Sequence, residues 1–198
     1  PGAWTYAGAA ASSTTTNTTI NGGSLVLDFV NLSSGSLLAP ASSLTFGGGA
    51  LVIKGRTGAG PSVMQQMGAV TLGAGGGNII LNPNTPNAGI STTGSFGALT
   101  ATAAGGAMLV TVPTAGTLKF NQAVTNGLLG NGRVVFSDGA GNFNWAVNTG
   151  ANTNTAIFTT GGTVLTNGTL LASGTLWNAQ VNGGGVTTGA AGSVNSLR

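Results

Sequence analysis

The sequence predicts an all-β fold with the architecture of a parallel β-solenoid built from degenerate short repeats. Three observations predict it: residues that favour helices are scarce, glycine recurs at 37 of 198 positions, and short apolar segments lie between the glycines. Because each glycine inside a helix costs about 1 kcal/mol, three uninterrupted helical turns are not expected. The fold class therefore follows from residue types alone.

The expected strands are short runs rich in Val, Ile, Leu, Phe and Thr, bounded by Gly or Asn. In chain order they cover residues 24–30, 50–54, 69–72, 78–81, 96–100, 107–112, 117–120, 133–136, 143–147, 155–159, 163–166, 169–172 and 175–181.

Two kinds of strand pattern occur. Some strands alternate, and the alternation at 143–147 and 175–181 predicts an apolar side that carries Trp145 and Trp177 into the core. Others are apolar on both sides, as at 51–53, 79–81 and 108–110. Such strands need cover on two faces, from this chain or from the strands of a neighbouring copy that complete the fold.

The corners between strands carry the chemistry of tight turns. Asn-Gly occurs five times, and both residues tolerate positive φ. A glycine followed by Thr and two aliphatic residues recurs at 162–165 and 168–171, which is typical of a solenoid whose coils stack on one another.

The predicted domain organisation has two parts. Residues 1–20 are rich in Ala, Ser and Thr and are expected to form a low-complexity arm or linker, whereas residues 21–198 form a single solenoid-like domain. An alternative role for the arm is strand addition to a neighbouring subunit.

The charge pattern excludes several classes of function. Five Lys and Arg residues and two Asp residues are scattered along the chain, so no basic surface for nucleic acid is expected. Apolar runs fall far short of the roughly 20 residues of a membrane helix. The abundance of Thr, Asn and Gly with few Lys and Arg favours an extracellular or cell-surface location.

The same inventory argues against catalysis. The chain has no His, Cys or Glu, and its two carboxylates, Asp28 and Asp138, are expected to be a strand residue and a turn residue. The glycine-rich runs lack the Gly-Lys-Ser/Thr sequence of a phosphate loop. No enzyme activity, cofactor or metal site is therefore expected.

The middle of the chain resembles a known family. Gly47–Gly55, with the sequence GGGALVIKG, is followed by GAVTLGAG at 68–75, IILNPN at 79–84, TNGLLG at 125–130 and FNWAV at 143–147. Across roughly residues 44–170 these phrases resemble the autotransporter-associated β-strand repeat proteins. The resemblance implies a secreted or surface-displayed parallel β-helix that serves adhesion or surface structure.

The function expected from these observations is that of a structural subunit of an extracellular self-assembling fibre, sheath or surface layer, with copies of the same chain as partners. The alternatives are a surface adhesin module that binds glycan or a host surface and, more remotely, a β-helix enzyme that cleaves polysaccharides. The candidate assembly residues are large apolar side chains of the expected strands: Leu25, Leu27, Phe29, Leu51, Ile53, Ile80 and Leu109.

Overall fold

A computed structural model describes the chain at residues 2–12, 14–32, 34–57, 60–83, 90–102, 106–122 and 128–148, together with the backbone of the strands beyond. The chain divides into two compact units, Pro1–Ile157 and Phe158–Arg198, which are described separately. The division falls after Ile157, whereas the boundary predicted from the sequence follows residue 20.

The first unit is a parallel β-solenoid of about four turns, which confirms the predicted fold class. Its strands are β1 (Ala3–Tyr6), β2 (Thr18–Asp28), β3 (Leu44–Lys54), β4 (Val63–Met67), β5 (Val70–Leu72), β6 (Gly77–Asn82), β7 (Thr92–Phe96), β8 (Leu99–Ala101), β9 (Met108–Thr111), β10 (Gly116–Phe120), β11 (Val134–Ser137), β12 (Phe143–Val147) and β13 (Ala156–Ile157). The described residues also include the 3₁₀ helices η1 (Phe29–Asn31) and η3 (Leu129–Gly132), which lie between strands.

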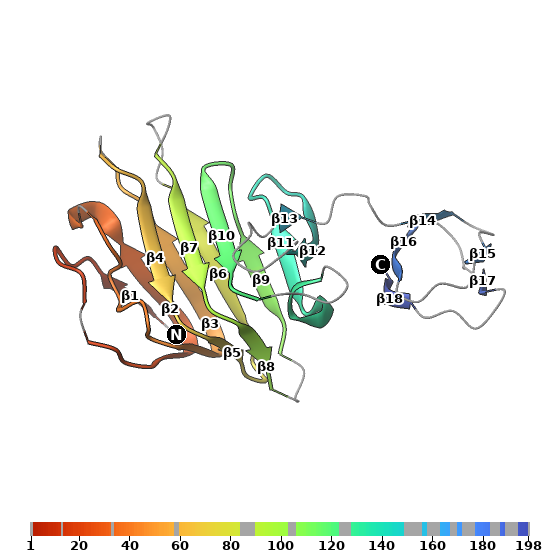
Figure 1. Cartoon of the computed structure of the whole chain (residues 1–198), viewed down its shortest axis with the longest axis horizontal. Coiled ribbons are helices and arrows are strands. Elements are labelled where there is room, and N and C mark those ends of the chain that lie inside the picture. The colour runs from red at the N-terminus through yellow and green to blue at the C-terminus, as the bar shows by residue number, and fades with distance from the viewer. Residues whose placement is uncertain are drawn as a thin grey trace. The chain divides into compact units, whose positions relative to one another are not determined.

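Each full turn contributes strands to three sides of the solenoid. The long side is formed by β1, the second half of β2, the second half of β3, and β6, β9 and β11, all parallel. The threonine side is formed by the first halves of β2 and β3 with β5 and β8. The third side is β4–β7–β10, and its strands β7 and β10 lie next to β3 and β6 of the long side (Figure 1).

The core is made by inward columns of stacked side chains. Residues of one column pair rung by rung, and all are buried: Leu25, Leu51, Ile79, Val110 and Phe136. Successive members are 26, 28, 31 and 26 positions apart in sequence. The Phe96 and Phe120 rings stack on the third side with centroids 5.4 Å apart. Burial of these large side chains supplies the main driving force for folding.

The C-terminal end of the first unit departs from the parallel pattern. β12 pairs antiparallel with β11, and β13 pairs antiparallel with β12. The predicted burial of the side that carries Phe143 was wrong, because Phe143 is 48% exposed while Ala146 is fully buried. The buried side chains at this end are instead Ala146, on β12, and Asn148, which follows the strand. Asn148 Nδ2 donates to the carbonyls of Phe120 and Gln122. Trp145 is only half-buried, and the side chain of Trp177 lies outside the described residues.

The second unit contains two small parallel sheets in the described part of its backbone. β14 (Thr163–Thr166), β16 (Trp177–Asn182) and β18 (Val194–Leu197) form one, and β15 (Leu170–Leu171) pairs with β17 (Thr187–Thr188) in the other. The repeated glycine phrases at 162–165 and 168–171 therefore lead into β14 and β15.

Candidate functional site

The first rung of the solenoid carries an exposed aromatic recess. β1 pairs with β2 in parallel, so that Trp4 lies beside Leu25 and Tyr6 beside Leu27. Leu25 and Leu27 point inward, and Trp4 and Tyr6 therefore continue the inward columns by one rung. Tyr6 packs against the core, but Trp4 is 71% exposed.

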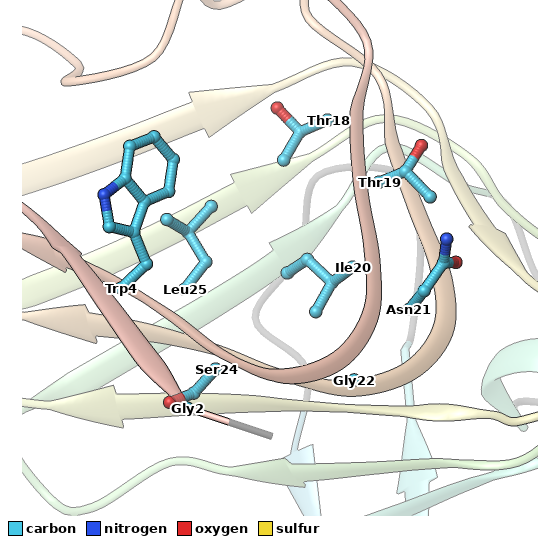
Figure 2. Close-up of a pocket in the computed structure, with 9 residues that line it drawn as sticks. All are labelled: Gly2, Trp4, Thr18, Thr19, Ile20, Asn21, Gly22, Ser24 and Leu25. Carbon is cyan, nitrogen blue, oxygen red and sulfur yellow. The ribbon is translucent and has the colours of Figure 1, made fainter.

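The recess next to Trp4 has a volume of about 210 Å³. Figure 2 shows the indole ring standing beside Leu25, with Ile20 next along the floor. Hydroxyl and amide groups surround this apolar floor, from Thr18, Thr19, Asn21 and Ser24. An exposed indole ring bordered by neutral polar groups can bind either an apolar side chain of another strand or the face of a neutral sugar.

The backbone at this rung is also open to a partner. Ser24 N–H donates to the Gly2 carbonyl, and the β1–β2 ladder continues from there. Within the described part of the chain, β2 is the one strand that pairs with β1. An edge of this kind presents unpaired N–H and C=O groups and can add a further strand.

Residues 7–12 and 14–17, which belong to the segment 1–20 expected to be a low-complexity arm or linker, follow the solenoid path of this chain. Ser12 N–H donates to the Leu37 carbonyl, and Thr16 N–H donates to Ser42 Oγ. The segment then enters β2 at Thr18, whose N–H donates to the Ser43 carbonyl. These contacts place the arm against its own chain.

The seven candidate assembly residues divide into two groups. Five lie in the interior of this chain, where their side chains are not available to a neighbour: Leu25, Leu27, Phe29, Leu51 and Ile53. Ile80 and Leu109 lie on the outward face of the long side and are half-buried. Trp4 is not one of these seven residues, although its place near the start of the chain predicts, as for Tyr6, that it packs against the chain end or meets another subunit. Among the described residues it is the most exposed large apolar side chain.

The two carboxylates have the structural roles expected from the sequence. Asp28 Oδ2 lies 2.7 Å from Lys54 Nζ, and its Oδ1 accepts the N–H of Val30 at the start of η1. Asp138 Oδ1 accepts the N–H groups of Ala140 and Asn142 in the turn before β12. Among the described residues no three acidic, His or Cys side chains come together as a metal site, and no helix there is long and apolar enough to cross a bilayer.

Comparisons with protein-family models, with curated proteins and with solved structures each give no match to this chain. The resemblance to autotransporter-associated repeats therefore stays a prediction from the sequence phrases.

Proposed function

We propose that this chain is a structural subunit that associates with copies of itself to build an extracellular fibre, sheath or surface layer. The observation that carries the proposal is Trp4, which occupies an inward position of the solenoid and is nevertheless 71% exposed. A strand added to the free edge of β1 covers the indole and extends the backbone ladder. Adding this strand buries apolar surface and satisfies edge hydrogen-bonding groups in one step.

The outward surface of the long side supports lateral contact between such rods. Val26, Val52 and Ile80 pair in register as an aliphatic column on this face, and Leu109 lies beside Val135 on the next column. With seven charged residues in the whole chain, like-charge repulsion between copies is small. Both features favour packing of one solenoid against another.

A second candidate function is supported by the recess itself. Hydroxyl and amide groups next to an exposed indole form the kind of surface that stacks on a sugar ring and binds its hydroxyls. On this alternative the chain is an adhesin module, and its ligand is a neutral glycan, because none of the residues that line the recess is charged.

The test of self-association compares two lysine variants of the full chain. Trp4→Lys places a charge at the open rung, whereas Met64→Lys places one at a side chain that is 45% exposed on the outward face of β4. We expect the wild type and Met64→Lys to sediment as large species and to form filaments in electron micrographs, and Trp4→Lys to remain small. A monodisperse wild type at high concentration, or equal assembly by both variants, contradicts the proposal.

A glycan array probed with labelled chain distinguishes the two functions. The adhesin alternative predicts binding of neutral glycans that Trp4→Ala abolishes and Met64→Ala retains. Assembly without glycan binding supports the structural subunit alone.

A further inference from the structure

The threonine side of the solenoid carries a regular row of threonines. Thr19 pairs with Thr45, Thr45 with Thr71, and Thr71 with Thr100, so the four side chains stack on four successive rungs. Thr45 and Thr71 point outward, because the residues before and after each of them are buried in the core. Thr19 and Thr100 continue the row through the strand register. Thr19 and Thr100 are exposed, and the two inner threonines are half-exposed.

The positions that flank this row on the same face are all small and uncharged. Two residues before and two residues after the threonines stand Asn17, Ser43, Ala69 and Ala98, and Asn21, Gly47, Gly73 and Thr102. Ser43 Oγ donates to Asn17 Oδ1 at 2.7 Å, which ties the first two rungs together at the margin. None of these positions therefore carries a long side chain, and at the last rung the Arg133 guanidinium borders the strip by donating to the Thr102 carbonyl.

The other two sides of the solenoid lack this property. The third side bears longer outward residues, including Met64, Gln66 and Lys119. The long side carries the Asp28–Lys54 ion pair and the aliphatic column at Val52 and Ile80. Among the three sides, the threonine side is therefore the one whose outward positions are all small and uncharged.

The hydroxyls at the last rung are held in place by the backbone of the rung before. Thr100 Oγ1 lies 3.4 Å from Thr71 Oγ1 and donates to the Val70 carbonyl. Thr102 Oγ1 donates to the Leu72 carbonyl at 3.1 Å. Side chains fixed in this way lose little entropy when they contact a rigid surface.

We propose that the threonine side binds ice. Backbone hydrogen bonding fixes the rung spacing at about 4.7–4.9 Å, which is within a few tenths of an ångström of the repeat of hexagonal ice along its a axis. A row of hydroxyl and methyl groups at this spacing orders water in step with that lattice. The threonines and the residues that flank them are uncharged, and the Arg133 guanidinium lies at the margin, where it donates to the Thr102 carbonyl. This activity does not require strand addition at β1, although Thr19 also lines the recess beside Trp4.

The test uses the full chain and two matched lysine variants. Thr71→Lys interrupts the row at an inner rung, whereas Thr93→Lys changes an outward, half-exposed threonine of β7 on the third side. Thermal hysteresis, inhibition of ice recrystallisation and partition of labelled protein into a growing ice front are measured. We expect the wild type and Thr93→Lys to be active and Thr71→Lys to lose about tenfold or more of its partition into ice.

Three results overturn the inference: a wild type with no effect on ice at its solubility limit, equal losses in both variants, or binding to crystalline cellulose or chitin without any effect on ice. If Thr71→Lys does not fold, judged by its circular dichroism, Thr19→Lys at the exposed first rung replaces it. Retention of full ice activity by folded Thr19→Lys then overturns the inference equally.

Discussion

Lys54 Nζ lies 2.7 Å from Asp28 Oδ2, and the two residues are direct partners in the β2–β3 register. The Asp28 side chain is 12% exposed and the Lys54 side chain 34% exposed. The same carboxylate accepts the Val30 N–H at 3.0 Å where the chain leaves the long side through η1. One aspartate therefore joins two rungs and fixes the corner that follows the first of them.

Replacing either partner tests this double role. Asp28→Ala removes the ion pair and the corner hydrogen bond, and we expect it to lower the free energy of unfolding by about 1–2 kcal/mol. Lys54→Met keeps the aliphatic stem and the corner bond, so its cost should stay below about 1 kcal/mol. Urea unfolding followed by circular dichroism measures both, and equal losses contradict the role of Asp28 at the corner.

Gln65 provides a second internal link. Its side chain is fully buried on β4, where Nε2 donates to the Leu38 carbonyl and Oε1 accepts the Leu38 N–H. The amide thus supplies hydrogen bonds to a segment of the preceding turn that has no strand structure. Gln65→Leu leaves both backbone groups of Leu38 without these partners.

We expect Gln65→Leu to destabilise the chain by about 2 kcal/mol or more, since each buried unpaired group costs about 1–3 kcal/mol. The matched control is Gln66→Leu, whose side chain is exposed on the outward face of the same strand. Its change in unfolding free energy should be within about 0.5 kcal/mol. A Gln65→Leu variant as stable as Gln66→Leu would show that Leu38 does not depend on this amide.

Glycine corners and apolar runs were enough to predict the solenoid and many of its strands. The segments at 69–72, 78–81, 117–120 and 143–147 lie within a residue of the observed bounds. The first three succeed because each of these strands has buried apolar side chains at every second position. The runs at 51–53 and 79–81 are apolar on both faces. Their outward residues, Val52 and Ile80, lie half-buried on the long side.

Other elements depend on contacts that sequence patterns do not encode. β4 contains two glutamines and gave no strand pattern, because the partners that satisfy Gln65 lie 27 residues away. The run at 96–100 was predicted as one strand but is divided between β7 and β8 at Gly97, where the chain turns a corner. The row of threonines was also invisible in sequence, since its members are 26, 26 and 29 positions apart and align only through the register.

Gly76 tests the requirement for glycine at a solenoid corner. Its φ is +64°, and a Cβ there would collide with the Ala107 carbonyl oxygen. We expect Gly76→Ala to destabilise the chain by about 1–3 kcal/mol through strain and the shift of the neighbouring backbone. Gly22→Ala is the control, because a Cβ at Gly22 meets no atom within 4 Å. Thermal unfolding midpoints that fall equally in both variants would contradict the corner argument.

Asp138 gives the turn before β12 a dependence on pH. The hydrogen bond from the Asn142 side chain, followed by that from the Ala140 N–H, holds the pKa of Asp138 below its usual value. A folded-state pKa below the unfolded one means that the turn is favoured while the carboxylate is ionised, above the unfolded pKa of about 3.9. Its stabilisation is lost as the pH falls through the lower folded-state pKa.

We therefore expect the amide signals of Ala140 and Asn142 to shift together in an NMR titration, with a midpoint below that of a free aspartate. Asp138→Asn should abolish this transition while the amide oxygen of Asn keeps an acceptor for the Ala140 N–H. A midpoint at or above the ordinary aspartate value would mean that the carboxylate is not bound within the turn, because only hydrogen bonds to the ionised form lower its pKa here.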